Sequence, residues 1–371
     1  MISWGMVKLF LIPMSWIYGW VVFIRNLLYD MKFFHSEEFE IPVISVGNIT
    51  VGGTGKTPHT EYLIKLLKSN FRVSVLSRGY RRKSKGFRLV ETTSDVMETG
   101  DEPLQIKRKF PGAVVSVCEN RAIGINTLLN MENPPDVVVL DDAFQHRRIN
   151  PGINIVLIDY NKPLKEDRLL PAGRLRESRY QLRRANIIII TKCPPEIKPI
   201  TRRIMAKDVF LFPYQELFFT TMTYGSVYPV FPGAPLPDLF SDTRNRGILL
   251  VAGVASPEPV IQHVKKLSSE VETLIFPDHH NYTAEDIQGI IGKYEAMNTH
   301  DKIIVTTEKD IAKLVRFDEL IEPIKPALYC LPVLVRFLDQ EGKLFDKKIR
   351  EYVGENKSNR ELHFRKNRNK S

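Results

Sequence analysis

The hydrophobic positions of this chain form short apolar runs that alternate with longer segments of helical spacing. Six runs rich in β-branched residues occupy residues 42–47, 71–76, 113–117, 136–140, 153–159 and 186–191. Continuous apolar strands joined by helix-length segments are typical of a parallel sheet that is covered on both faces. The pattern therefore predicts an α/β fold built on a doubly wound parallel sheet.

A second group of apolar runs follows a proline-rich segment. Prolines at positions 229, 232, 235 and 237 disfavour a continuous helix or a central strand there. Thr283 followed by Asp286 predicts a capping box at the start of a later helix. We expect a second, smaller α/β domain, with strands in the runs at residues 247–253, 272–280, 301–310 and 327–333.

The N-terminal region differs, because residues 9–24 carry no charge and include two tryptophans and a tyrosine. The run is short for a complete membrane span and contains Pro13, so a helix seated in one leaflet is favoured over a crossing. It lacks the compact basic start and the cleavage site of a signal peptide. We expect membrane contact here, and a buried helix covering the domain core is the alternative.

Length and charge narrow the class of protein. A chain of 371 residues is long enough for two domains, and its net charge of +10 favours an acidic partner such as nucleic acid, anionic lipid or a phosphorylated metabolite. The basic clusters are not interleaved with aromatic residues beyond Tyr80, so we expect no nucleic-acid partner. Cys118, Cys193 and Cys330 are far apart and lack metal-ligand spacing, which indicates reduced cysteines of a cytoplasmic protein.

The segment between the first strand and the next helix fits the P-loop pattern G-x-x-x-x-G-K-[ST], except that Thr50 replaces the first glycine. Its glycines let backbone N–H groups turn toward phosphate oxygens, Lys56 supplies a cation, and Thr57 offers a hydroxyl to Mg²⁺. A glycine-rich turn that only joins strand and helix is the alternative. The predicted nucleotide-binding residues are Thr50, Val51, Gly52, Gly53, Thr54, Gly55, Lys56 and Thr57.

Two carboxylates, Asp141 and Asp142, directly follow the apolar run at residues 136–140. Adjacent carboxylates oppose each other's ionisation unless a cation lies between them, and Mg²⁺ is the natural cation beside a P-loop. A turn or a helix cap is the alternative. We therefore predict that Asp141 and Asp142 bind Mg²⁺ together with Thr57.

Three further segments carry chemistry that the sequence leaves open. Residues 77–86 hold five basic side chains at a strand end, where they are either solvated or bind a phosphate or an anionic lipid surface. Asp101 either starts a helix near its N-cap or accepts a proton from an attacking hydroxyl. His279 and His280 are either surface residues or tune a carboxylate.

Taken in order, these motifs resemble those of the tetraacyldisaccharide 4'-kinase family of lipid A biosynthesis. The apolar N-terminus occupies the place of that family's membrane helix. The matching stretches lie between about residues 43 and 312 and read VGNITVGGTGKTP, LSRGYRRKSKG, GDEP, LDDAFQHRRI, LLPAGRLRES, AGVASPE, FPDHH and TTEKD. The departures are Ala143, where glycine is frequent, and Arg174, where proline is frequent.

The resemblance implies an enzyme that uses ATP and Mg²⁺ to phosphorylate the 4'-hydroxyl of tetraacyldisaccharide 1-phosphate. It implies a location at the cytoplasmic face of the bacterial inner membrane. Asp101 takes the role of catalytic base, assisted by His279, although the choice between His279 and His280 stays open. Glu177 joins the metal site. The residues implied at the acceptor or the transferring phosphate are Arg78, Tyr80, Glu102, Gln145 and His146, besides Lys56.

The expected organisation follows from these assignments. Two other functions stay open, a soluble P-loop kinase of a small metabolite and a nucleotide-switched membrane adaptor. The oligomeric state is open, with a monomer expected. The expected parts are a membrane-associating helix at 1–34, a P-loop kinase domain at 35–227, a linker at 228–246, a second domain at 247–354 and a frayed basic tail at 355–371.

Overall fold

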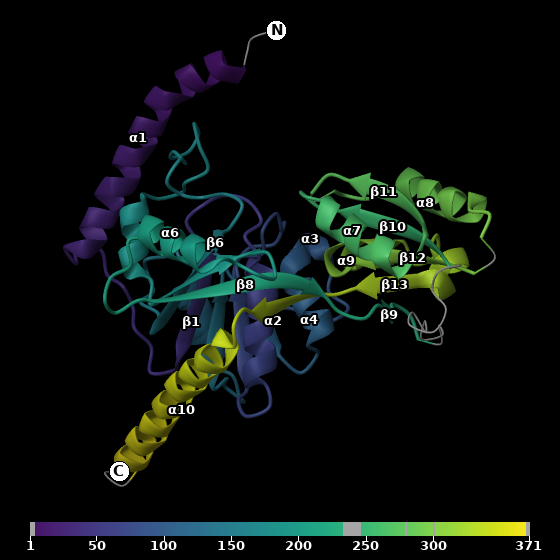
Figure 1. Cartoon of the computed structure of the whole chain (residues 1–371). Helices are drawn as coiled ribbons and strands as arrows, with labels where there is room; N and C mark the ends of the chain where they lie inside the picture. Colours follow the sequence, from purple (N-terminus) through teal and green to yellow (C-terminus); the bar gives the residue numbers. More distant parts are fainter. Residues whose placement is uncertain (1–3, 233–245, 279, 300, 369–371) are drawn as a thin grey trace. The chain divides into compact units, whose positions relative to one another are not determined.

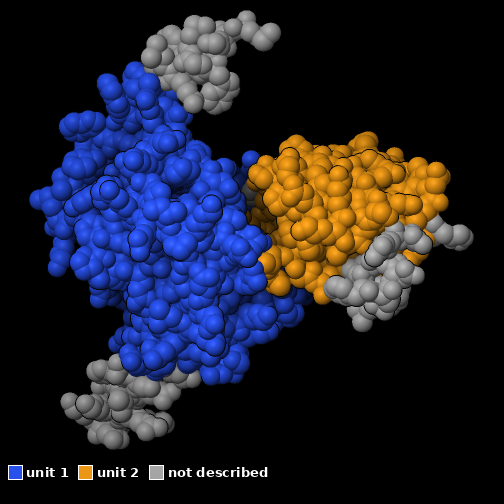
Figure 2. Space-filling model, viewed as in Figure 1, with its two compact units in different colours: residues 1–94, 106–222, 335–371 blue, residues 95–105, 223–334 orange. Residues whose placement is uncertain are grey.

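The computed structural model describes residues 4–232, 246–278, 280–299 and 301–368. The chain forms two units, which Figure 2 distinguishes by colour. Unit 1 comprises residues 1–94, 106–222 and 335–371, and unit 2 comprises residues 95–105 and 223–334. The chain therefore leaves unit 1 twice and returns to it twice.

Unit 1 is built on a nine-stranded sheet (Figure 1). Its neighbouring strands from β4 to β8 pair in parallel, and β3 is antiparallel to β4. The strands β1, β2, β5 and β7 are buried at every position, as their continuous apolar sequences predict. In spatial order the sheet consists of β14 (Val333–Phe337), β8 (Glu216–Tyr224), β7 (Ile187–Thr191), β6 (Ile153–Asp159), β1 (Val43–Asn48), β5 (Val137–Asp141), β2 (Val73–Ser77), β4 (Val114–Val117) and β3 (Arg88–Leu89).

Helices connect these strands and cover the sheet, which confirms the predicted doubly wound fold. Ile125 and Leu128 of α5 pack against residues of β2 and β5, whereas Val209 of α6 packs in a separate core with residues of β6 and β7. Cys118, Cys193 and Cys330 are buried and are not joined in disulfides. The helices of unit 1 are α1 (Trp4–Asp30), α2 (Lys56–Leu67), α5 (Arg121–Leu129), η1 (Arg179–Arg184), α6 (Pro199–Val209) and α10 (Glu341–Arg368).

Unit 2 is the predicted smaller α/β body, with a five-stranded sheet in the order β11 (Glu270–Phe276), β10 (Gly247–Gly253), β12 (Lys302–Thr307), β13 (Leu328–Leu331) and β9 (Tyr228–Pro229). Thr283 and Asp286 form the predicted capping box at the start of α8. The helical segments here are α3 (Val96–Thr99), α7 (Glu258–Leu267), α8 (Ala284–Ala296), α9 (Glu308–Leu314), η3 (Val315–Phe317) and η4 (Glu322–Ala327), and α4 (Asp101–Lys109) begins in this unit and ends in unit 1.

The predicted domain boundaries are wrong in three places. Residues 335–354 belong to unit 1, where Phe337 and Phe345 pack their rings against Tyr62 of α2. Residues 95–105 belong to unit 2. The proposed linker begins with β9, which pairs with β13, and its residues 233–245 lie outside the described part of the chain.

The predicted frayed tail is also wrong, because α10 continues to Arg368. Buried Phe345, Ile349 and Val353 recur with helical spacing along α10 and fix its first half on unit 1. The polar composition at residues 355–368 therefore marks the continuation of a helix whose beginning is anchored.

The N-terminal helix α1 extends past the predicted apolar run at both ends and contains Pro13. Its segment Leu11–Asp30 is long and apolar enough to cross a membrane, judged by length and composition. Two hydrogen bonds hold α1 against the rest of unit 1. The Ser15 hydroxyl donates to the Leu169 carbonyl at 2.9 Å, and the Tyr18 hydroxyl donates to the Arg176 carbonyl at 2.8 Å. The tryptophans Trp16 and Trp20 remain exposed.

Candidate functional site

The predicted P-loop connects β1 to α2, and Lys56 is the first residue of that helix. Gly52 and Gly55 adopt left-handed backbone angles, with φ of +108° and +87°. A Cβ atom on Gly55 would also meet the flexible end of the Met222 side chain, so a larger residue here would need a strained backbone and a shift of Met222. Gly52 and Gly53 are exposed beside the helix N-terminus, which is an arrangement suited to binding phosphate.

Polar contacts from the sheet fix this loop. The Asn48 amide donates to the buried Thr54 hydroxyl at 3.0 Å, and the Thr191 hydroxyl donates to the Thr54 carbonyl at 2.9 Å. The Thr50 backbone bridges to Leu175, so the residue that replaces the first P-loop glycine joins the loop to the segment carrying Glu177. The loop conformation is therefore determined by contacts with residues far away in the sequence.

A buried histidine, His59, supports the P-loop through a hydrogen bond to its backbone. The sequence analysis missed this residue. His59 Nδ1 lies 2.7 Å from the Gly55 carbonyl, and His59 Nε2 lies 3.1 Å from the Thr220 hydroxyl. Burial lowers the pKa of His59 to about 4, so the ring is neutral at pH 7. With its proton on Nδ1 it donates to Gly55 and accepts from Thr220, which makes it a structural residue.

The two aspartates lie at the end of β5, beside the P-loop lysine. Lys56 Nζ is 3.8 Å from Asp142 Oδ1, and the Thr60 hydroxyl donates to Asp141 Oδ1 at 3.3 Å. Asp141 Oδ2 is buried and has no hydrogen-bond partner within the described residues. The structure thus brings together Lys56 of the P-loop and both predicted metal ligands of β5.

The two carboxyl groups differ in their tendency to ionise. Burial raises the pKa of Asp141 to about 6, and the negative charge of Asp142 adds to this effect. Burial also opposes ionisation of Asp142, but Lys56 and Arg176 outweigh it and lower the pKa of that group. Asp142 is therefore a stable anion, whereas Asp141 carries a full charge at neutral pH at the cost of a buried, unpartnered oxygen. A cation at Asp141 Oδ2 would remove that cost.

Arg176 holds Asp142 and Gln145 together. Its guanidinium donates to both Asp142 oxygens at 3.0 and 3.1 Å and to Gln145 Oε1 at 3.2 Å. The Gln145 amide in turn donates to the Asn48 carbonyl at the end of β1, at 2.7 Å. The sequence analysis missed Arg176, although it directly precedes Glu177 in the quoted motif.

Glu177 does not join the two aspartates. Its two oxygens accept hydrogen bonds from Arg184 and, at 3.3 Å, from the Asn26 amide of α1. Within the described ranges, no group of three or more His, Cys, Asp or Glu side chains is placed to hold a metal ion. Glu177 thus connects α1 to η1 in this structure, and its expected metal role stays a prediction.

A basic pocket of about 440 Å³ lies in unit 1 and contains several predicted acceptor residues. Burial, followed by the charges of Arg121 and Arg78, lowers the pKa of His146 to about 3, so His146 is neutral. Tyr80 is exposed and does not line the pocket. The lining residues are Arg25 and Tyr29 of α1 together with Arg78, Glu119, Asn120, Arg121, Gln145, His146, Arg147, Arg148 and Ile149.

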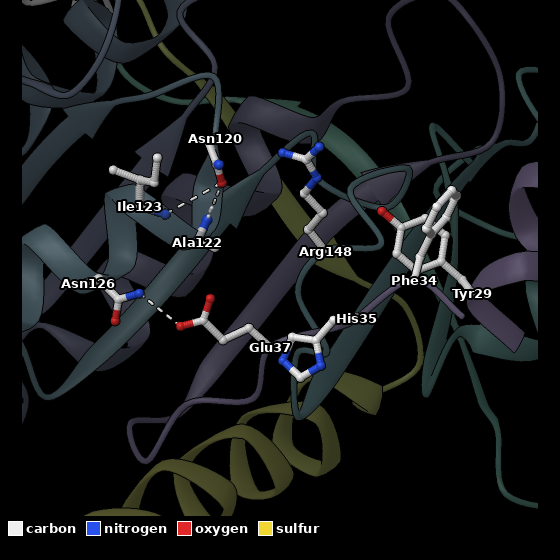
Figure 3. A pocket seen from close by; sticks show the side chains of 9 residues that line it. All are labelled: Tyr29, Phe34, His35, Glu37, Asn120, Ala122, Ile123, Asn126 and Arg148. Carbon is white, nitrogen blue, oxygen red and sulfur yellow. Dashed lines mark hydrogen bonds between the residues drawn. The ribbon is translucent and has the colours of Figure 1, made fainter. Parts of the chain in front are cut away.

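A second pocket of about 430 Å³ shares Tyr29, Asn120 and Arg148 with the basic pocket (Figure 3). The rings of Tyr29 and Phe34 meet edge to face, with centroids 5.2 Å apart, and Figure 3 shows them at one side of this space. One pocket is thus mainly cationic and its neighbour contains aromatic surface.

The predicted base lies in unit 2. Asp101 is buried at the start of α4, as the helix-start interpretation predicted, and its Oδ1 accepts from the Glu102 N–H at 3.0 Å. Lys313 Nζ lies 3.4 Å from Asp101 Oδ2 and donates to the His280 carbonyl at 3.1 Å. Lys313, which the sequence analysis missed, therefore connects Asp101 to the histidine segment.

Of the two adjacent histidines predicted to assist Asp101, the structure describes only His280. The His280 ring is 2.8 Å from Asp286 Oδ2 and stacks on Phe276, with ring centroids 4.7 Å apart. His280 is thus engaged by its own helix cap. His279, the predicted assisting residue, lies outside the described residues.

Comparison with known proteins gives concordant results. Residues 7–352 match the family described as tetraacyldisaccharide-1-P 4'-kinase. A tetraacyldisaccharide 4'-kinase of Phocaeicola vulgatus is 47% identical over 351 residues, which cover 94% of this chain and 96% of the relative. One of Bacteroides thetaiotaomicron is 46% identical and covers 97% of each chain. The crystal structure of LpxK from Aquifex aeolicus in complex with ATP superposes with a TM-score of 0.71 at 30% identity, over 94% of this chain and 99% of that one.

Proposed function

The chain belongs to the tetraacyldisaccharide 4'-kinase family, and we propose that it transfers the γ-phosphate of ATP to the 4'-hydroxyl of a tetraacyldisaccharide 1-phosphate in lipid A biosynthesis. The observation that carries this proposal is the P-loop whose Lys56 lies beside Asp142 at the end of β5. This is the arrangement that P-loop kinases use to hold a nucleoside triphosphate with its metal. The ATP complex of the Aquifex aeolicus protein supports ATP as the donor.

Residues of α2 and of the end of β5 fit a Mg²⁺ ion. Thr57, Asp141 and Asp142 supply oxygen donors, which Mg²⁺ prefers, and the unpartnered Asp141 Oδ2 is the atom that such a cation would satisfy. When bound, Mg²⁺ supplies charge neutralisation for the phosphates. Lys56 holds the nucleotide phosphates, and Arg176 keeps Asp142 in the orientation needed for binding.

Asp101 is the proposed base that accepts the proton of the attacking 4'-hydroxyl. Its carboxylate is held at the start of α4 by the Glu102 N–H and by Lys313, so its orientation is set before the acceptor arrives. We propose that His279 assists it, as family resemblance implies, and that Glu102 contacts the acceptor. Lys313 acts as a positioning residue because it connects Asp101 to the segment that carries the histidines.

The basic pocket is the proposed site for the phosphate that the acceptor already carries. It contains five arginines and a single carboxylate, Glu119, and guanidinium groups bind phosphate with paired hydrogen bonds. We propose that Arg78, Gln145 and His146 contact the acceptor there, with Tyr80 at the exposed rim. The neighbouring pocket with Tyr29 and Phe34 offers aromatic surface to the less polar part of the lipid.

The proposed location is the cytoplasmic face of the bacterial inner membrane. The helix α1 leaves Trp16, Trp20 and Phe23 exposed, while its own Arg25 and Tyr29 line the basic pocket. An apolar helix that also forms part of the acceptor pocket suits a substrate that is drawn from the bilayer. This contribution of α1 to the pocket favours a lipid kinase over a soluble kinase with the same P-loop.

The test is transfer of label from γ-labelled ATP to the tetraacyldisaccharide 1-phosphate, in detergent with Mg²⁺. Lys56→Ala is expected to abolish labelled lipid, whereas Lys65→Ala, which removes an exposed lysine from the same helix, is expected to retain it. Wild-type protein that binds ATP but labels no lipid would contradict the proposal. ATP turnover without a phosphorylated product would then favour the nucleotide-switched adaptor.

A further inference from the structure

A group of large apolar side chains on unit 1, apart from α1, is exposed to solvent. We name it the α6 surface, and it consists of Ile200, Ile204, Phe210, Phe212 and Tyr214. The exposed fractions are 59% for Ile200, 54% for Ile204, 74% for Phe210 and 57% for Tyr214. Five such residues within fifteen positions form a patch, whereas apolar residues exposed one at a time are ordinary.

The core does not account for this surface, because α6 already has a buried face. Val209 is buried and Met205 packs beside it against the core formed with β6 and β7. Ile200 and Ile204 lie one helical turn apart on the outward side. The helix α6 therefore has apolar residues facing the core and further apolar residues facing outward.

The end of α6 presents a large ring to the outside. Phe210 caps the helix with φ of +52°, a left-handed conformation that is uncommon for a bulky residue. Directly after it, the rings of Phe212 and Tyr214 stack with centroids 5.7 Å apart. The helix end thus adopts an unfavourable backbone conformation while Phe210 gains little burial within the chain.

Exposed cations surround these apolar side chains. Lys198 is exposed at the N-cap of α6, and the exposed Arg203 and Lys207 follow the spacing of Ile200 and Ile204 along the outward face. Apolar and aromatic side chains mixed with lysine and arginine are typical of a surface that lies in the interface of an anionic bilayer.

Polar contacts through Arg183 connect the α6 surface to the end of α1. The Tyr214 hydroxyl donates to the Arg183 carbonyl at 2.5 Å, and the Arg183 side chain is paired with Asp30, the last residue of α1. A single chain of contacts therefore joins the stacked rings to the apolar helix.

We propose that the α6 surface docks on an anionic lipid bilayer as a second contact besides α1. The proposal rests on the proposed lipid kinase function, in which α1 is seated in the membrane. The basic residues favour anionic lipid as the occupant over a second copy of this cationic chain, whose net charge is +10. One anchor leaves the enzyme free to rotate about it, whereas two contacts fix the orientation of unit 1 relative to the lipid.

The first test places an environment-sensitive fluorophore at single introduced cysteines, which is practical because the three native cysteines are buried. The labelled variants of the full chain are Ile204→Cys, Phe210→Cys, Trp20→Cys on α1 and Lys347→Cys on α10 as the exposed control. With vesicles of phosphatidylcholine and phosphatidylglycerol, we expect a blue shift and quenching by lipid-borne quenchers at positions 20, 204 and 210, and neither at 347.

The outcomes separate this inference from the function on which it rests. Quenching at position 20 without quenching at 204 and 210 would overturn the second contact and leave membrane seating of α1 intact. The absence of quenching at all three positions would contradict both. A blue shift at 204 that depends on protein concentration and needs no vesicles would assign the surface to self-association, and would also overturn the proposal.

A kinetic test uses the double variant Ile204→Glu/Phe210→Glu, with Leu344→Glu as a control at an exposed leucine of α10. We expect the KM for acceptor presented in the same vesicles to rise roughly tenfold in the double variant, because two buried apolar contacts are lost. The rates in detergent and those of the control should match wild type. An unchanged KM in vesicles, with the double variant folded and active in detergent, would refute the proposal.

Discussion

The buried carboxylates of Asp141 in unit 1 and Asp101 in unit 2 have opposite surroundings. In unit 1, Asp141 keeps one oxygen buried and unpartnered beside Asp142, and burial raises its pKa to about 6. In unit 2, Asp101 lies 3.4 Å from Lys313 and also accepts a backbone hydrogen bond. At the first site one carboxylate oxygen has no hydrogen-bond partner among the described residues, whereas the carboxylate of the second site is held by Lys313 and the Glu102 N–H.

This difference suggests a division of work. A site that is incomplete without a cation binds one strongly, because binding removes an existing electrostatic cost. A carboxylate that is already oriented can accept a proton without first reorganising. Substitutions at the unit 1 site should therefore weaken the binding of metal and nucleotide. Substitutions at the unit 2 site should lower kcat or the stability of unit 2.

The largest expected effect is the loss of turnover in the variant Asp101→Asn. Removing a general base typically costs 10²- to 10⁴-fold, so we expect kcat to fall by about three orders of magnitude while the Kd for ATP stays unchanged. The assay is lipid phosphorylation combined with a direct ATP-binding measurement, with Glu98→Gln on the neighbouring helix α3 as the control. A variant that kept wild-type kcat would remove Asp101 from the base role.

Next in size is the loss of stability from Lys313→Met. This change leaves Asp101 buried without its cation, which typically costs about 3 to 5 kcal/mol of the free energy of unfolding. The matched control is Lys309→Met in the same helix α9, because the pair formed by Lys309 and Asp278 is more exposed and should contribute about 1 kcal/mol or less. Thermal unfolding measures the loss of stability in both variants. Equal losses would show that the pair of Asp101 and Lys313 stabilises unit 2 no more than the exposed pair does.

Arg176→Ala should separate metal binding from turnover. Arg176 donates to both oxygens of Asp142, and loss of a residue that orients a metal ligand typically weakens metal binding about 10- to 100-fold. We expect the Mg²⁺ concentration for half-maximal activity to rise by that factor. Arg174→Ala is the control in the same segment, because Arg174 pairs with Asp167 instead. An unchanged Mg²⁺ requirement would mean that Asp142 needs no such support.

The sequence predicted the unit 1 site better than the unit 2 site, for a physical reason. The P-loop and the Asp141/Asp142 pair follow continuous apolar strands, and adjacent parallel strands deliver their carboxyl ends to one edge of a sheet. Asp101 and Lys313 meet through the packing of short helices, which no local period encodes. The same limitation explains why His59, Arg176 and the return of α10 to unit 1 were missed.

Glu177 shows a different limitation of the sequence. Its motif could be recognised, but its hydrogen-bond partners could not be predicted. The motif predicts a metal ligand at this carboxylate, and the fold places Arg184 and Asn26 against it. Motif spacing specifies that a charge is present in a loop. Only the surrounding structure decides whether that charge is already balanced.

The smallest effect, and the one that tests the comparison most directly, is that Asp141→Asn should stabilise the metal-free protein. Because the pKa of Asp141 is raised in the folded state, the stability it contributes is fully present below its unfolded pKa and is lost as pH rises toward about 6. At pH 7 with a metal chelator, the loss is at most about 3 kcal/mol, because one pKa unit corresponds to about 1.4 kcal/mol. Asn carries no charge to desolvate, so the variant should unfold at a higher temperature than wild type and lose this pH dependence.

The control lies at the other end of the same strand. Asp136 accepts a hydrogen bond from the Arg72 N–H at 2.8 Å and pairs with the Arg72 side chain, so Asp136→Asn should be neutral or destabilising under the same conditions. With saturating Mg²⁺ the order should reverse, because wild type gains binding energy that Asp141→Asn cannot. A chelated Asp141→Asn protein less stable than wild type would show that Asp141 is balanced within the chain, as Asp101 is, and the contrast between the two sites would fail.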